Sequence, residues 1–249
     1  MRRGLSTNDS TSHAIMYLEL GWVPIIFLLK ERRLLYLHYV LNESAESMIF
    51  QFMQAQLAEP LRGDWAVTIR EDIKDLKLDK YSFDEIRAMS KIQFKTIIQR
   101  AIRTEAFNYL IQKKNTQSKI KHIKYLNLSM QPYLKPNSIV NSVAKFHFKA
   151  RSSMLNLRGN FKSSYKDTNF CQRCLDISEP ETQIHAFYCN SLASTEISNA
   201  DIKYEDLFSD NLSKQLTVSN ILMKRMEKRD QLIKSRETNS LTHTTVGSQ

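Results

Sequence analysis

Residues 171–189, CQRCLDISEPETQIHAFYC, decide how we expect the C-terminal half of the chain to fold. They contain all three cysteines of the sequence, Cys171, Cys174 and Cys189, together with His185. Two cysteines separated by two residues can bind one metal ion from a tight turn, and His185 and Cys189 are four apart, so on a helix they share a face. Four such ligands complete the tetrahedral site that structural Zn²⁺ prefers, with no open position for catalysis. The pattern predicts a CCHC zinc finger over residues 167–195.

The alternative is that three cysteines and a histidine are clustered by chance. Against it, every cysteine of the 249-residue chain is used, and the spacing fits a turn followed by a helix. An odd number of clustered cysteines also fits a metal site in a reducing compartment better than disulfides. Metal binding at such sites stabilises the fold by roughly 10–16 kcal/mol in finger peptides, so loss of zinc should unfold the segment.

The positive charge is concentrated just before this motif. The net charge is +10, yet residues 106–166 contain no Asp or Glu. Twelve of the 36 Lys and Arg residues lie in that stretch, interleaved with aromatic residues, and the rest of the chain has fewer basic than acidic residues. A local positive field beside stacking rings suits RNA or DNA, and the alternative is a solvated basic face on a helical domain. The expected contacts are Lys145, Lys149, Arg151, Arg158, Phe161, Lys162, Tyr165, Lys166 and Arg173.

Hydrophobic periodicity predicts helices along most of the chain, and five Gly and five Pro are few for an all-β fold. We expect helices over 25–41, from Ser44 to Pro60, and after Asp64. Ser82 with Glu85 and Ser90 with Gln93 have capping-box spacing, and the second should open the longest helix, to about 113. Ser138 should cap a helix to about 151, and a last helical region should run from 204 to about 234.

The expected fold is mainly α, a helical domain followed by a small CCHC zinc-binding finger and a C-terminal helix. Few or no strands are expected, with a short hairpin at 168–176 as the candidate. The expected domains are a disordered N-terminus (1–13), a helical domain (14–114), a basic linker and helix (115–166), the finger (167–195), a C-terminal helical region (196–236) and a disordered tail (237–249). No signal peptide or membrane span is evident, which predicts an intracellular protein, cytoplasmic or nuclear.

The motif in its context resembles the zinc-binding segment that follows the polymerase domain in non-LTR (LINE-like) retrotransposon reverse transcriptases. The matching stretch is FKSSYKDTNFCQRCLDISEPETQIHAFYC, residues 161–189. Less specific similarity extends upstream, in LELGWVPIIFLLKERRLLYLHYVL (18–41), FQFMQAQLAEPLRGDW (50–65) and FHFKARSSMLNLRGNF (146–161), and covers roughly residues 17–235. The resemblance implies thumb-like and linker helices, zinc ligation by Cys171, Cys174, His185 and Cys189, and nucleic-acid binding by the region.

No catalytic residue is transferred from this family. Reverse transcriptases use an adjacent Asp pair to hold two Mg²⁺ ions, and no Asp-Asp pair occurs in this sequence. The acidic neighbours such as Glu71-Asp72 lie in amphipathic helical patterns, and no Gly-rich phosphate loop is present. An enzyme is therefore the least favoured interpretation. The resemblance implies a non-catalytic C-terminal fragment, from a truncated gene model or a decayed element copy.

Two hypotheses remain. In the first, the basic segment and the finger bind RNA or DNA, with an affinity that falls steeply with salt. In the second, zinc only staples a helical bundle that docks on another protein, such as the reverse transcriptase palm domain, without binding nucleic acid. The apolar residues of 14–57 favour the second hypothesis, because a face that once packed against a partner would stay apolar.

Overall fold

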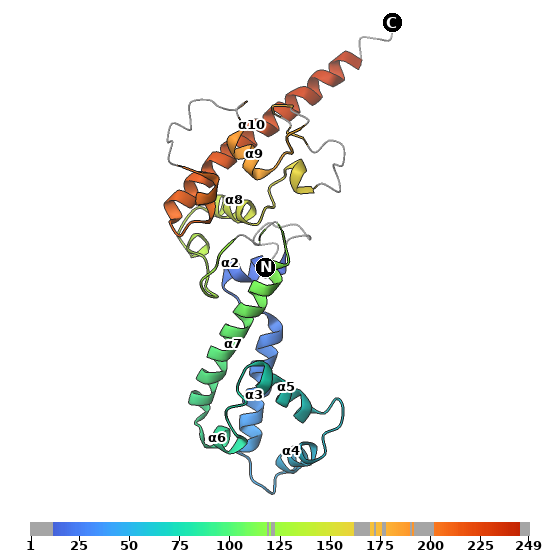
Figure 1. The fold of residues 1–249 in the computed structure, drawn as a ribbon, viewed down its shortest axis with the longest axis vertical. Helices are drawn as coiled ribbons and strands as arrows, with labels where there is room; N and C mark the ends of the chain where they lie inside the picture. Colours follow the sequence, from blue (N-terminus) through green and yellow to red (C-terminus); the bar gives the residue numbers. More distant parts are fainter. Residues whose placement is uncertain are drawn as a thin grey trace. The chain divides into compact units, whose positions relative to one another are not determined.

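The computed structural model describes residues 12–118, 120, 123–161, 170–171, 173–175, 178–189, 191 and 202–244, with only the backbone of residues 161 and 237–244. The chain divides into two compact units. The N-terminal unit comprises His13–Thr116 and Tyr125–Met130, and the C-terminal unit contains Gln117–Lys124 and Gln131–Gln249. The described residues are mostly helical and include no strand, so the expected mainly α fold is confirmed (Figure 1).

Six helices form the described part of the N-terminal unit. They are α2 (His13–Leu20), α3 (Ile25–Leu41), α4 (Met48–Ala58), α5 (Trp65–Asp75), α6 (Phe83–Ala88) and α7 (Lys91–Asn115). The long helices α3 and α7 lie side by side, and α2, α5 and α6 pack against one or other of them (Figure 1). Between α3 and α7 lies the core, in which Leu34, Ile98 and Phe94 are completely buried.

Local hydrogen bonds fix where several of these helices begin. The Ser82 backbone N–H donates to Glu85 Oε2 at 2.7 Å while Ser82 Oγ accepts from the Glu85 N–H at 3.2 Å. Ser90 and Gln93 repeat this reciprocal pair at the start of α7. Both predicted capping boxes are therefore confirmed. The predicted bounds of α3 are also those of the structure.

The predicted start of α4 is wrong, whereas the predicted start of α5 after Asp64 is confirmed. α4 begins after Ser47, whose hydroxyl accepts from the Phe50 N–H, and not at Ser44. Asp64 does precede α5, but its carboxylate accepts from the Leu61 N–H at 2.8 Å and makes no cap. The Asp64 carboxylate thus has a competing local partner, and the preference of single residue types for helix caps does not predict such competition.

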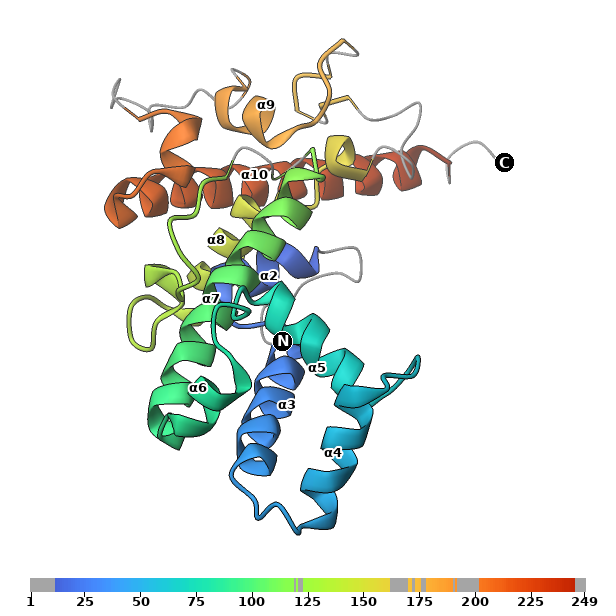
Figure 2. The same ribbon diagram turned by 60° about the horizontal axis from the view of Figure 1, so that its bottom comes forward.

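The C-terminal unit is built around one long helix. Its elements are η1 (Pro132–Leu134), α8 (Asn141–Arg151), η2 (Arg158–Phe161), α9 (Gln183–Tyr188), η4 (Tyr204–Phe208) and α10 (Leu212–Thr244). α8, α9 and η4 all pack against α10 (Figure 2). The core between them contains Phe187, Leu207 and Leu222, each at most 1% exposed.

Three features of this unit differ from the sequence-based expectation. Ser138 does not cap α8, because its hydroxyl bonds the carbonyls of Tyr133 and Lys135, and the helix starts only at Asn141. α10 continues to Thr244, past the helix end expected near residue 234. Of the hairpin expected at 168–176, the structure describes residues 170–171 and 173–175, where Phe170 forms an isolated antiparallel bridge with Pro180.

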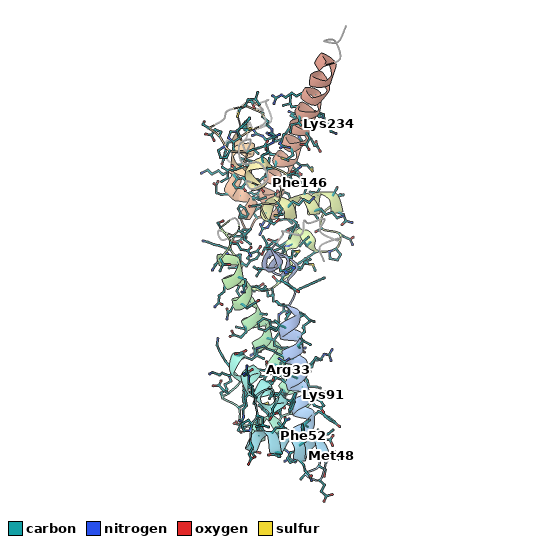
Figure 3. All side chains as sticks on the ribbon, turned by 90° about the vertical axis from the view of Figure 1, so that its right-hand side faces the viewer. Arg33, Met48, Phe52, Lys91, Phe146 and Lys234 are labelled. Carbon is teal, nitrogen blue, oxygen red and sulfur yellow. The ribbon has the colours of Figure 1, made fainter. Side chains whose placement is uncertain are left out.

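The helices α3 and α4 carry an exposed apolar face. Ile25, Leu29 and Tyr36 on α3 are about half exposed, and on α4 Met48 is 84% and Phe52 64% exposed (Figure 3). None of the described helices alone has the length and apolar character needed to cross a bilayer. α2 and α3, bent by 65°, meet those criteria only when counted together.

Candidate metal centre

Four side chains from two short segments converge on one point in the C-terminal unit. The sulfurs of Cys171, Cys174 and Cys189 and a ring nitrogen of His185 all lie within 4.8 Å of one another. The sulfurs of Cys171 and Cys189 are 3.8 Å apart, and the sulfur of Cys174 is 3.5 Å from His185 Nε2. A disulfide has its sulfurs about 2.0 Å apart, so these cysteines are free thiols. The group could hold a metal ion, as the sequence predicts.

The first two cysteines are held by a tight turn. The Leu175 N–H donates to the Cys171 carbonyl at 3.0 Å, and Leu175 adopts a left-handed backbone conformation with φ of 57°. The Cys171 N–H donates to the Glu179 carbonyl at 2.9 Å and closes the loop that follows the turn. This chain reversal directs both sulfurs to the same side.

The other two ligands come from α9. Thr182 caps this helix, since its hydroxyl accepts from the His185 N–H at 3.1 Å. His185 therefore lies in the first turn and Cys189 directly follows the last helical residue, which places both side chains on one face. The four-residue spacing of the sequence explains this geometry, although the helix itself is only six residues long.

Glu179 orients the histidine. Its Oε2 lies 3.4 Å from His185 Nδ1, on the opposite side of the ring from the Nε2 that faces Cys174. A carboxylate on the second ring nitrogen fixes the tautomer in which Nε2 is free to ligate a metal. Nothing in the sequence marks Glu179 as a partner of the histidine, because a Glu six residues before a histidine follows no fixed spacing rule.

Two of the four ligands are buried, and the other two, Cys174 and His185, are more exposed. Cys171 and Cys189 are buried, whereas Cys174 is exposed. Burial raises the pKa of the Cys171 thiol to about 12. Burial acts most strongly and would raise the pKa of Cys189, but the hydrogen bonds with Ser191, Cys171 and Cys174 together outweigh it, so that pKa lies below its ordinary value.

A buried ion pair connects the metal loop, the segment between Cys171 and the start of α9 at Gln183, to α10. Arg229 donates from Nε and Nη2 to the two carboxylate oxygens of Glu181, at 2.7 and 2.8 Å, and both side chains are at most 7% exposed. The Arg158 N–H donates to the same carboxylate at 2.8 Å. Gly159 N–H donates to the Glu181 carbonyl, and a Cβ on Gly159 would lie 2.7 Å from that oxygen. Glu181 thus joins η2, the metal loop and α10.

A second arginine of α10 holds α9. Arg225 Nη1 donates to the Ala186 carbonyl at 3.1 Å and also to the Phe187 carbonyl. Its guanidinium lies over the Phe187 ring, 5.9 Å from the centroid. Carbonyls near the C-terminal end of a helix lack partners within the helix, so α10 satisfies groups that α9 leaves open.

Arg173, between the first two cysteines, is buried as well, with 6% exposure. Nη1 makes a long contact of 3.4 Å to the Ala186 carbonyl. Within the part of the chain that the structure describes, Nε and Nη2 have no hydrogen-bond partner. Burial lowers the pKa of Arg173 to about 10, the charges of Cys189 and Cys171 act to raise it, and Arg225 and Arg229 act to lower it.

The residues expected to contact nucleic acid are placed in different environments. Arg151 is 3% exposed, donates to the Leu207 carbonyl at 2.8 Å and packs inside the unit, as Arg173 does. Lys145, Lys149 and Arg158 are partly exposed. The side chain of Phe161 and the residues Lys162, Tyr165 and Lys166 lie outside the described part. Nucleic-acid contact stays a prediction for all of them, and the two arginines Arg151 and Arg173 are buried inside the unit.

Two histidines outside the metal centre are buried. His38 is 8% exposed and bonds the Met89 carbonyl. His147 is fully buried, with Nδ1 2.5 Å from Ser219 Oγ and Nε2 3.1 Å from Gln215 Oε1. Burial lowers the pKa of His147 to about 3, so the ring is neutral. Both histidines are polar members of the protein interior.

Comparisons with protein-family models, with curated proteins and with solved structures found no match. The metal centre is therefore interpreted from its own residues. It offers four ligands, two of them buried, and its carboxylate and arginines serve to hold those ligands in place.

Proposed function

We propose that the chain is a zinc-stabilised, non-catalytic module that binds nucleic acid, of the kind found at the C-terminal end of retrotransposon reverse transcriptases. The observation that carries the proposal is the convergence of Cys171, Cys174, His185 and Cys189 on one point. The function is binding, because a metal with four protein ligands has no position left for a substrate or a water molecule.

The distances between the ligand atoms support zinc as the metal. Tetrahedral Zn²⁺ has Zn–S bonds of about 2.3 Å and Zn–N bonds of about 2.0–2.1 Å. Those bond lengths imply a separation of roughly 3.8 Å between two ligating sulfurs and roughly 3.5–3.6 Å between sulfur and nitrogen. The separations of 3.8 Å for Cys171–Cys189 and 3.5 Å for Cys174–His185 agree with both values. Three thiolates and one imidazole also favour zinc over the hard cations Mg²⁺ and Ca²⁺.

The binding of nucleic acid is supported by the positive charge of the sequence that precedes the metal ligands. Residues 106–166 hold twelve basic and no acidic residues, and they lead directly into the metal-binding segment. On α8 the side chains of Lys145 and Lys149 lie one turn apart and are partly exposed, so a phosphate backbone can reach both. Likeness to the retrotransposon family rests on the motif and its flanking sequence.

The test is a mobility-shift titration of the zinc-loaded full chain with single-stranded RNA across a salt series. We expect affinity to fall steeply with salt, with the logarithmic slope reduced by on the order of one for each phosphate contact removed. Lys145→Glu with Lys149→Glu should reduce both affinity and slope. The matched control is Lys91→Glu with Lys95→Glu, an equal charge change at exposed positions of α7. Equal effects of the two double variants, or a binding constant independent of salt, would contradict the proposal.

A second candidate function is docking on another protein. The observation that favours it is the exposed apolar face of α3 and α4, where Met48 and Phe52 are more than half exposed (Figure 3). In this case zinc only stabilises the C-terminal unit, the apolar face of α3 and α4 meets a partner, and RNA binding is absent at low salt. The same titration separates the two functions.

A further inference from the structure

We propose that Arg173 is the built-in counter-charge of the metal centre and that it stabilises the metal-bound form through the sulfurs of Cys171 and Cys189. The inference rests on the proposed zinc function and deepens it, because it assigns a role to a residue that is not a ligand.

A buried arginine requires an anion or several acceptors, since an unpaired charge away from water is strongly destabilising. Arg173 is 6% exposed, and in the described part of the chain two of its three nitrogens, Nε and Nη2, have no hydrogen-bond partner. The third makes one long contact to a carbonyl. The described protein groups therefore leave its charge almost uncompensated.

The neighbouring arginines do not share this condition. Arg229 is paired with both carboxylate oxygens of Glu181, which is 1% exposed. Arg225 donates to two carbonyls of α9. The charges of Arg225 and Arg229 lower the pKa of Arg173, whereas those of Cys189 and Cys171 raise it.

Metal binding supplies the missing anion. A cysteine ligates zinc as the thiolate, so the loaded centre contains three negative sulfurs, one neutral imidazole and one divalent cation. Its net charge is a single negative charge, which one guanidinium neutralises. The N–H groups of Arg173 can donate to the two buried thiolates, and such charge-assisted bonds are the strong ones inside a protein. The arginine and the metal thus stabilise each other.

The position in the chain makes this coupling direct. Arg173 lies inside the turn between Cys171 and Cys174, so its backbone is fixed by the same turn that directs the sulfurs. Residues that hold first ligands in place typically contribute 10- to 100-fold to metal affinity. We expect a change of about that size on removing the charge of Arg173.

The experiment measures the zinc dissociation constant of the full chain by competition with a chromophoric chelator. Arg173→Met should weaken zinc binding by about 10- to 100-fold. Arg173→Lys, which keeps the charge, should recover most of that loss. The matched control is Arg151→Met, which removes an equally buried arginine of the same unit that bonds the Leu207 carbonyl, and it should leave zinc affinity unchanged. Absorption spectra of the Co²⁺-loaded variants verify that the same four ligands bind.

The outcomes separate the two claims. If the unmodified chain binds no stoichiometric zinc, the proposed function fails and the role of Arg173 fails with it. If the unmodified chain binds zinc and Arg173→Met binds it equally tightly, the inference alone is overturned. It is also overturned if Arg173→Lys loses as much affinity as Arg173→Met, because the charge would then not be the cause. Should Arg173→Met not fold, Arg173→Gln, which also removes the charge, takes its place in the comparison with Arg173→Lys and Arg151→Met.

Discussion

Arg229→Met should destabilise the C-terminal unit by roughly 3–5 kcal/mol, the usual effect of breaking a buried ion pair from one side. The structure gives the reason. Glu181 is 1% exposed, and Arg229→Met removes the guanidinium from both of its carboxylate oxygens, while the Arg158 N–H still donates to one of them. A buried charge that loses its partner suffers the full desolvation penalty, whereas its hydrogen bond to the backbone offsets only about 1.5–3 kcal/mol.

The assay is amide hydrogen exchange of the zinc-loaded chain, followed in peptides that cover α9 and the facing turns of α10. A loss of 3–5 kcal/mol corresponds to exchange that is roughly 10² to 5 × 10³ times faster, at 1.36 kcal/mol per decade. The double variant Glu181→Gln with Arg229→Met should recover a large part of the loss, since no charge is then left unpaired.

The matched control is Lys77→Met in the N-terminal unit. It also breaks an ion pair of good geometry, 2.6 Å from Lys77 Nζ to Glu105 Oε1, but the Lys77 side chain is 73% exposed. Exposed pairs contribute roughly 0–1 kcal/mol, so exchange near Lys77 should change little. An equally small effect of Arg229→Met would refute the argument that the Glu181–Arg229 pair holds the metal loop on α10.

Three further perturbations test other parts of the structure. Because the unfolded chain binds a proton at His147 with a pKa of about 6.5 and the folded chain only near 3, stability is fully present above pH 6.5 and is lost progressively as pH falls towards 3. At pH 5.5 the loss is about 1.4 kcal/mol, and urea titrations at pH 7.5 and 5.5 should show it in the unmodified chain but not in His147→Gln. Gly159→Ala forces a Cβ against the Glu181 carbonyl and should lower the urea midpoint by the equivalent of about 1–3 kcal/mol. Ser90→Ala removes the hydroxyl that accepts from the Gln93 N–H, and thermal unfolding followed by circular dichroism should show a loss of about 0.5–2 kcal/mol.

Features that depend on neighbouring residues could be predicted from the sequence. The two capping boxes need only residues three apart, and the bounds of α3 follow from Pro24 and a dense apolar run. The metal ligands were also accessible, because the turn of Cys171 and Cys174 and the helical spacing of His185 and Cys189 are local. The local predictions that were wrong concern helix caps with competing partners, such as Ser138, whose hydroxyl bonds two preceding carbonyls.

The supports of the metal centre could not be predicted. Arg225 and Arg229 lie in a stretch of α10 rich in charged residues, where a basic side chain is ordinarily solvated. Their burial follows from the docking of α9 and the metal loop, whose residues are about 40 positions away. The charge of Arg173 suggested a nucleic-acid contact, and only the tertiary structure shows that this residue is buried.

The central claim is tested most directly by counting the metal ions bound per chain. Native mass spectrometry of the full chain purified with zinc should show one Zn²⁺ per molecule, and Cys174→Ser should lose it. His13→Gln, which alters an exposed histidine of α2, should keep it. A chain that carries no zinc, or a Cys174→Ser variant that retains it as the His13→Gln control does, would contradict the account.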